Sequence, residues 1–247
     1  MIRYAILNDQ GDREYQEDTV FVCQSKGRQL FLVADGLGGH GHGKDASQTM
    51  ADCAGSFFKT ESDNDVLIRK IFQDGNTELV KKQNMLNNFQ TMKTTCVLAV
   101  VDHGVIRIAH VGDSRGYLFQ KRKVLYQTLD HSVPQMLAQS GEITERQIRK
   151  HPDRNKLLRV LGEKDQEIKY AASPAVSRRN IDAMLLCTDG FWEYITETYM
   201  LKYLRKANSV REWIFYMKKH IQKAGRNENR DNCSAIGVWF DREKLWR

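Results

Sequence analysis

The chain has 247 residues, of which 41% are hydrophobic and 28% charged, a balance typical of globular proteins that excludes a largely disordered chain. Lysine and arginine outnumber aspartate and glutamate by 38 to 31, a net charge of +7 that suits an acidic or phosphorylated partner but is also common on solvated surfaces. The five cysteines are scattered and the longest apolar runs span about six residues, so we expect reduced thiols, no signal peptide, no membrane association and a cytoplasmic location.

Runs rich in apolar and β-branched residues predict a series of strands along the chain. They cover Tyr4–Leu7, Thr19–Cys23, Leu30–Ala34, Cys96–Val101, Val105–His110, Gly116–Phe119, Ala183–Cys187 and Ser234–Phe240. A short turn joins the fourth run to the fifth, and another joins the sixth to a further run at 124–127. These neighbours are therefore expected to be antiparallel.

Helical spacing of apolar residues occurs in blocks between the strands. The blocks cover about 46–57, 64–82, 191–206 and 210–221. Because strands are grouped with strands and helices come in pairs, the order favours an α+β layered sandwich over a βαβ alternation. No linker or repeat interrupts the chain, so we expect a single domain over residues 1–247.

The stretch from 132 to 162 predicts an inserted helical flap. Ser132 is a candidate helix N-cap with Pro134 in the first turn, and Thr144 and Gln147 have the spacing of a capping box. Two short helices separated by Gly141 are therefore expected. The segment also contains six basic residues, which either steer acidic phosphoproteins toward the flap or form a solvated helical face: Arg146, Arg149, Lys150, Arg154, Lys156 and Arg159.

Acidic residues flank the predicted strands at five places. Two apolar strands end in Asp-Gly, at Asp35 and Asp189, Asp113 follows a third strand, Asp231 precedes the last, and Glu17-Asp18 precede the second. A single Asp-Gly is typical of an exposed turn. Carboxylates gathered at rigid strand ends, however, repel one another unless a cation lies between them, and oxygen ligands select Mg²⁺ or Mn²⁺ over zinc or copper. The five positions together favour a divalent metal site.

The loop from 35 to 43 contains five glycines and two histidines. Gly36 lacks a Cβ, so its carbonyl can approach an ion closely. The spacing of His40 and His42 is not that of a helical zinc pair, and no cysteine is near, which disfavours zinc. Proton transfer by His40 and a loop histidine in solvent both stay open.

Arg13 lies five residues before Asp18 and would lie near the acidic centre if Asp18 does. A guanidinium binds two phosphate oxygens at once, a geometry that lysine cannot reproduce. The alternative is a surface arginine that pairs with Glu14 or Glu17.

These pieces in this order resemble the metal-dependent serine/threonine protein phosphatase family of type 2C, in its bacterial form. The resemblance extends over nearly the whole chain. It rests on the segments GDREYQED (11–18), FLVADGLGGHGHGKDAS (31–47), MKTTCVLAVV (92–101), AHVGDSRGYLF (109–119), LDHS (129–132), HPDRNKLLRVLG (151–162), LLCTDGFWE (185–193) and RDNCSAIGVWF (230–240).

The resemblance implies a four-layer αββα sandwich, in which two central antiparallel sheets are flanked by pairs of helices and the flap lies beside the active site. It also implies two Mn²⁺ or Mg²⁺ ions. Asp35 would bridge both ions, the carbonyl of Gly36 would complete the first, and Asp189 and Asp231 would hold the second.

Further roles follow from the same resemblance. Asp18 and Glu17 would act mostly through ordered waters, and Asp113 with Asp189 would hold a third, weaker ion of bacterial members. Arg13 matches the family's phosphate-binding arginine.

The implied activity is hydrolysis of phosphoserine and phosphothreonine on proteins by a metal-activated water, without a phosphoenzyme. A bacterial serine/threonine kinase and its substrates would be the partners, with no nucleic acid. Two alternatives stay open: a catalytically silent relative that only binds phosphoproteins, and a two-metal nuclease or phosphodiesterase.

The sequence departs from the family pattern near the proposed site. Leu37 occupies the position of a histidine that serves as general acid in animal members, which leaves the acid open between a water and His40. Lys93 and Lys44 replace a glycine and a glutamate that are common in relatives. None of the proposed metal ligands is lost.

Overall fold

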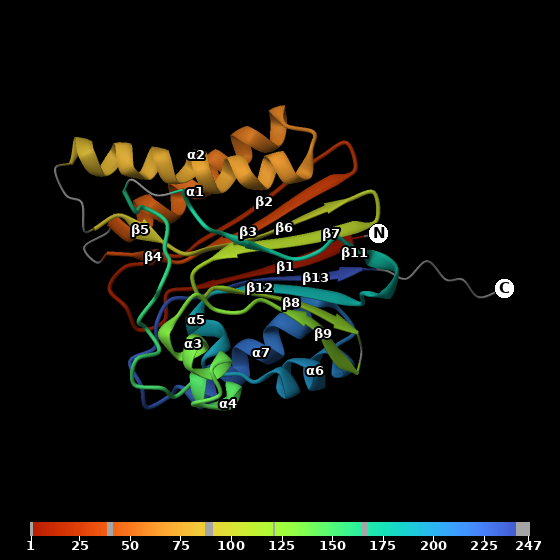
Figure 1. Cartoon of the computed structure of the whole chain (residues 1–247). Coiled ribbons are helices and arrows are strands. Elements are labelled where there is room, and N and C mark those ends of the chain that lie inside the picture. The colour runs from red at the N-terminus through yellow and green to blue at the C-terminus, as the bar shows by residue number, and fades with distance from the viewer. Residues whose placement is uncertain (1, 39–41, 87–90, 121, 165–166, 241–247) are drawn as a thin grey trace.

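The computed structural model describes residues 2–38, 42–86, 91–120, 122–164 and 167–240. Two antiparallel sheets lie face to face at its centre (Figure 1). In spatial order, the first contains β1 (Ile2–Asp9), β13 (Cys233–Phe240), β12 (Ala183–Cys187), β8 (Arg115–Gln120) and β9 (Lys123–Gln127). The second contains β10 (Ala171–Ala172), β7 (Val105–Val111), β6 (Cys96–Asp102), β3 (Arg28–Ala34) and β2 (Thr19–Ser25), while β11 (Val176–Ser177) also pairs with β7. All the predicted strands are confirmed.

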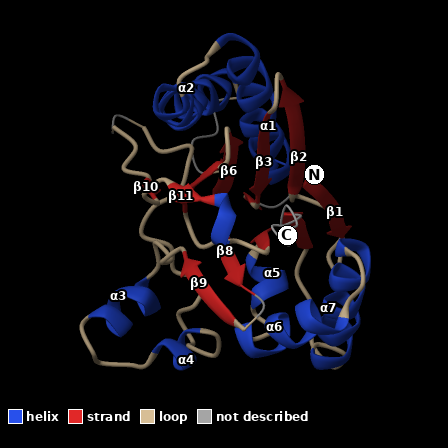
Figure 2. Cartoon of the chain, turned by 90° about the vertical axis from the view of Figure 1, so that its right-hand side faces the viewer, coloured by secondary structure: helices blue, strands red, loops and turns tan. Residues whose placement is uncertain are grey.

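Helices cover the outer face of each sheet, as Figure 2 shows from the side. On the second sheet, α1 (His42–Thr60) and α2 (Asn64–Met85) bury one apolar cluster, and on the first sheet α5 (Asp189–Trp192), α6 (Glu197–Lys206) and α7 (Val210–Ala224) bury another. A third cluster, which includes Phe31, Leu118 and Met184, fills the space between the sheets. This is the expected αββα order of layers.

The single helix predicted over 191–206 was wrong. The structure breaks it into α5 and α6, because Thr196 has an extended backbone (φ −86°, ψ 159°) that cannot continue a helix. Ile195 is fully buried at this break and packs into the cluster beneath α6 and α7. Burial of that one side chain therefore outweighs the helical pattern.

The flap contains the two expected short helices, α3 (Val133–Gln139) and α4 (Glu145–Ile148), which project to one side of the sandwich (Figure 2). Ser132 caps α3, since its hydroxyl accepts a hydrogen bond from the Gln135 amide. At the start of α4 the Gln147 side chain accepts one from the Thr144 amide at 2.8 Å. The chain then returns to the sandwich, where Leu157 bridges to Ser132.

The strand order explains why the acidic residues meet. Each acidic residue borders a strand end, and antiparallel register places these ends at one edge of the sandwich. The pairs there are Ala34 with Thr19, Cys96 with Val111, and Cys187 with both Arg115 and Ala235. The short pair β4 (Gly36–Leu37) and β5 (Lys93–Thr94) lies at the same edge (Figure 1).

None of the described helices has the length and apolar character that a bilayer crossing requires.

Candidate active site

A pocket of about 430 Å³ opens at this edge of the sheets. Its walls bring together five of the six predicted metal-site residues, four aspartates and Gly36, and the flap adds Asn155 and Leu157. The acidic side chains in the lining are Glu14, Glu17, Asp35, Asp113, Asp189 and Asp231, and Arg13 is the basic side chain among them. The pocket is therefore strongly acidic, with a guanidinium at its wall.

Asp18 lies behind the pocket wall and is fully buried. One carboxylate oxygen, Oδ2, accepts a hydrogen bond from the Thr188 hydroxyl at 3.0 Å, while Oδ1 has no hydrogen-bond partner in the described structure. Burial, with repulsion from Asp189 and Asp231, raises the pKa of Asp18 to about 7. An unpartnered oxygen of this kind is costly, and a cation nearby would relieve the cost.

The pocket carboxyls raise one another's pKa values. Burial, followed by the charges of Asp18 and Asp189, raises the pKa of Asp35 well above its usual value. Burial and Asp231 raise the pKa of Asp189 to about 6, against a hydrogen bond from Asp35 that lowers it. Burial and Asp189 also raise the pKa of Asp113. A site of converging carboxyls that disfavour their own ionisation fits divalent cations.

Arg13 pairs with Asp231 rather than facing the pocket alone. The guanidinium makes two bonds, from Nε to Oδ1 at 3.0 Å and from Nη2 to Oδ2 at 2.7 Å. The surface alternative, in which Arg13 pairs with Glu14 or Glu17, is thus not what forms. With Arg13 on Asp231, no three Asp, Glu, His or Cys side chains of the described residues form a group ready to hold a metal ion. The carboxyls instead face a common cavity and are partly satisfied by one another and by Arg13.

Gly36 occupies a position where no side chain fits. A Cβ at Gly36 would lie 2.1 Å from the carbonyl oxygen of Gly43 and 2.7 Å from that of Glu17. The preceding carbonyl, that of Asp35, accepts hydrogen bonds from the Thr94 hydroxyl at 2.7 Å and the Thr95 amide at 2.9 Å. The backbone of the Asp-Gly turn is therefore fixed by close packing at Gly36 and by hydrogen bonds to the Asp35 carbonyl.

Asn232 supports the site through hydrogen bonds that sequence reasoning did not single out. Its amide side chain accepts a hydrogen bond from the Glu17 amide at 2.8 Å and donates to the carbonyls of Gln10 and Tyr15 at 2.8 and 2.9 Å. It thereby fixes the loop that carries Arg13. The sequence signal for this residue was its position directly after Asp231. An asparagine side chain both accepts and donates hydrogen bonds, so when buried it can link several backbone groups.

Lys44 bonds to the backbone of Asp18, behind the acidic pocket. Its ammonium donates to the Asp18 carbonyl at 2.9 Å and to the Thr19 hydroxyl at 2.8 Å. Leu37 lines the pocket as a side chain with no proton to give. His40, the candidate proton donor, lies outside the described residues, so its place relative to the pocket stays a prediction.

Half of the six basic flap residues are ion-paired. Arg149 pairs with Glu197, Arg154 with Glu193 at 2.7 Å and Lys156 with Asp153 at 2.9 Å. A paired cation contributes little long-range attraction. The steering hypothesis therefore concerns Arg146, Lys150 and Arg159 only.

Comparison with known proteins identifies the family. The sequence profile of protein phosphatase 2C matches residues 10–230. The chain is 34% identical over 237 residues to the serine/threonine phosphatase stp of Listeria monocytogenes, covering 93% of this chain and 92% of the relative.

Solved structures agree with this family. The serine/threonine phosphatase Stp1 of Staphylococcus aureus has a TM-score of 0.86 at 28% identity, over 98% of this chain and 96% of that one. The catalytic domain of the phosphatase PstP, crystallised with two manganese ions, has a TM-score of 0.80 at 25% identity, over 96% and 97% of the two chains. The chain thus belongs to the protein phosphatase 2C family and is a bacterial, metal-dependent serine/threonine protein phosphatase.

Proposed function

We propose that the acidic pocket is the catalytic site and that it holds two Mn²⁺ or Mg²⁺ ions. Asp35, Gly36, Asp189 and Asp231 would be their ligands, with Asp18 and Glu17 supporting them through waters. The observation that carries this proposal is the convergence of carboxyls with raised pKa values around one cavity, backed by the unpartnered Oδ1 of Asp18. Asp113 together with Asp189 would hold a third, weaker ion.

The ions, when bound, supply the Lewis acidity that makes water a nucleophile toward phosphorus near neutral pH. The chain's own residues bind the phosphoryl group and handle the proton of the leaving group. Arg13 binds two oxygens of the phosphoryl group and balances their charge in the transition state. To do so it must leave Asp231, so that ligand formation by Asp231 and phosphate binding by Arg13 accompany each other.

The leaving oxygen of serine or threonine needs a proton. Leu37 cannot provide it, and we propose that His40 does. Asn232 keeps Arg13 in reach by holding its loop, and the Thr188 hydroxyl orients the Asp18 carboxyl through its hydrogen bond to Oδ2.

We further propose that phosphoproteins made by a bacterial serine/threonine kinase are the substrates. The names of the bacterial relatives support this substrate class. Five free thiols support a reducing, cytoplasmic setting. The family match over 10–230 supports one catalytic domain that includes the flap.

The test compares wild type with Asp189→Asn in Mn²⁺-dependent hydrolysis of a phosphothreonine peptide. Loss of one ligand charge should lower kcat at least about 100-fold. Asp74→Asn, an exposed acid on α2, is the matched control and should retain wild-type activity. Equal activity in all three proteins would refute the assignment of the pocket.

Two further measurements separate the alternatives. Cleavage of single-stranded DNA or RNA with Mn²⁺ would favour a nuclease, and we expect none. A catalytically silent relative would bind the phosphopeptide without releasing phosphate, whereas we expect calorimetric Mn²⁺ binding together with turnover.

A further inference from the structure

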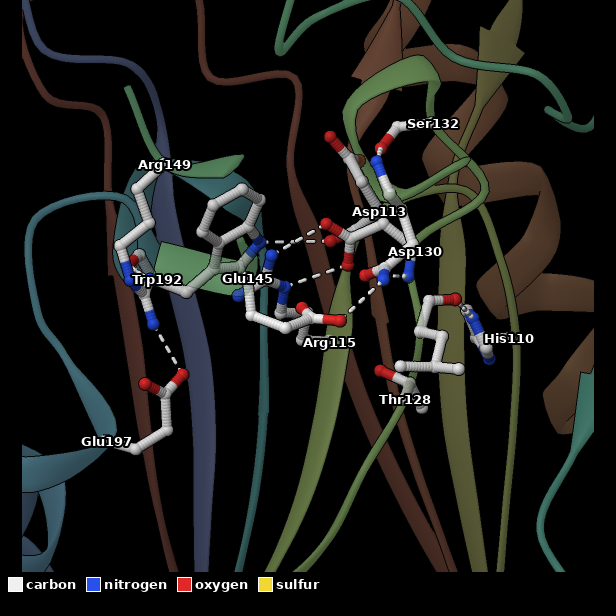
Figure 3. Close-up of polar contacts among 12 residues, drawn as sticks. His110, Asp113, Arg115, Thr128, Asp130, Ser132, Glu145, Arg149, Trp192 and Glu197 are labelled. Carbon is white, nitrogen blue, oxygen red and sulfur yellow. Dashed lines mark hydrogen bonds and ion pairs between the residues drawn. The ribbon is translucent and has the colours of Figure 1, made fainter. Parts of the chain in front are cut away.

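Arg149 connects the flap to the body of the enzyme. It follows the last turn of α4, and its guanidinium donates to the backbone carbonyl of Trp192 and to the carboxylate of Glu197 on α6 (Figure 3). Its side chain is 12% exposed. Burial alone would raise the pKa of the Glu197 carboxyl, yet Arg149 lowers it below the usual value. The arginine is therefore a buried contact rather than a solvated surface cation.

Trp192 in turn is tied to the wall of the catalytic pocket. The indole is 2% exposed, and its Nε1–H donates to the backbone carbonyl of Asp113 at 2.9 Å (Figure 3). The guanidinium of Arg115 lies 3.6 Å from the ring centroid, which adds a cation–π contact. Trp192 therefore has one fixed position between the flap and Asp113.

The segment that leads into the flap reaches the same tryptophan. Arg115, stacked on Trp192, makes two bonds to Asp130, which lies just before α3. Between these two contacts, Gln135 on α3 donates to Glu145 on α4 at 3.0 Å. The helical part of the flap is thus fixed relative to Trp192 on both sides, through Asp130 before α3 and through Arg149 after α4.

We propose that Arg149 is a positioning residue that holds the flap closed against Trp192 and Glu197, and so keeps the pocket wall in place for protein substrates. The flap supplies Asn155 and Leu157 to that wall, a few residues after Arg149. The kinetic part of this inference rests on the proposed function. The structural part, which is the connection from Arg149 through Trp192 to Asp113, is independent of the proposed function.

The geometry requires a guanidinium rather than any cation. Arg149 uses separate nitrogens, Nη1 and Nη2, for acceptors on α5 and α6. A lysine donates from a single nitrogen, so it cannot reproduce the geometry of two bonds made from separate nitrogens of one planar group. Lys150, the next residue, is exposed and makes no ion pair within the described part of the chain. It carries the same charge without the contact and is the matched control.

The first test is kinetic, with a phosphothreonine peptide and a small aryl phosphate as substrates. Arg149→Ala should raise KM for the peptide about tenfold, the effect of losing a charge-assisted hydrogen bond, with kcat changed less than about threefold. A small aryl phosphate has no peptide to contact the flap, so we expect its kinetics to stay within about twofold. Lys150→Ala should match wild type for both substrates.

Several outcomes would overturn the proposal. If Arg149→Ala and Lys150→Ala weaken peptide hydrolysis equally, long-range attraction by charge accounts for the effect. If Arg149→Ala changes both substrates alike, or neither, the flap contact does not select for protein substrates. Should Arg149→Ala fail to fold, Arg149→Lys decides the question, because it keeps the charge and most of the packing. We expect Arg149→Lys to raise KM for the peptide by an intermediate amount. A wild-type KM for the peptide in this variant would refute the proposal.

The second test needs neither metal nor substrate and so stands apart from the proposed function. Indole N–H signals of ¹⁵N-tryptophan-labelled protein are recorded, and Trp192→Phe assigns the signal of Trp192. We expect this signal to shift, and its hydrogen exchange to speed up, in Arg149→Ala and Arg149→Lys but not in Lys150→Ala. An unmoved Trp192 signal in the Arg149 variants would refute the connection even if the enzyme is fully active.

Discussion

The ion pair between Arg115 and Asp130 gives the sharpest stability prediction. Its side chains are 4% and 1% exposed, and the two bonds from Nε and Nη2 to the carboxylate measure 2.8 and 2.6 Å. Asp130→Asn keeps the size of the side chain but replaces one acceptor oxygen by an NH₂ group that faces an arginine N–H. One bond is then lost, two donors oppose each other, and the guanidinium charge is buried without a counter-charge.

Removing one partner of a buried ion pair typically costs about 3–5 kcal/mol. The stacking of Arg115 on Trp192 and its 3.4 Å contact with the Tyr117 hydroxyl do not replace the missing charge. For a chain of this size, about 4 kcal/mol corresponds to a fall in Tm of about 8–16 °C. Urea and thermal unfolding, followed by far-UV circular dichroism, measure both quantities.

A double-mutant cycle shows whether the charge pair is responsible. Arg115→Met leaves Asp130 unpaired and should cost a similar amount, whereas the double variant buries no lone charge. We expect the double variant to lose at least about 2 kcal/mol less than the sum of the single changes. Strictly additive effects, or an Asp130→Asn protein within about 1 kcal/mol of wild type, would show that this reasoning is wrong.

Three other changes test the site and the fold. Burial, with the charges of His110 and Arg159, lowers the pKa of His131 from 6.5 to about 3, so the unfolded chain binds a proton that the folded one does not, and stability should fall as pH drops through this window. His131→Asn should flatten the pH dependence of the unfolding midpoint, and an unchanged slope would exclude His131 as its source. His40→Asn should lower kcat for a phosphothreonine peptide at least about tenfold and spare an aryl phosphate, whose leaving group needs no proton; equal losses would exclude a general-acid role. Arg13→Lys should lower kcat/KM about 10–100-fold and weaken inhibition by inorganic phosphate, and a wild-type phosphate affinity would argue against phosphate binding by Arg13.

The fold was largely predictable because its signals are local. The strand patterns, the caps of the flap helices at Ser132 and Thr144 and the helical spacing of 64–82 each lie within a few consecutive residues. The break between α5 and α6 was missed, since it depends on Ile195 entering a core that the local pattern does not contain. The acidic positions were likewise predictable, because each is a motif at a strand end.

The amino-acid sequence by itself determined the strands, most helices, the acidic motifs and, through them, the family. The tertiary structure decided which side chains of these motifs contact one another. Arg13 bonds to Asp231, 218 positions away, and Asn232 holds the loop before Glu17. Arg149 likewise bonds the flap to Trp192 and Glu197. The reason is physical. Periodicity and capping arise from neighbours along the chain, whereas an ion pair or a buried hydrogen bond depends on which side chains the packed sheets bring within about 3 Å of each other.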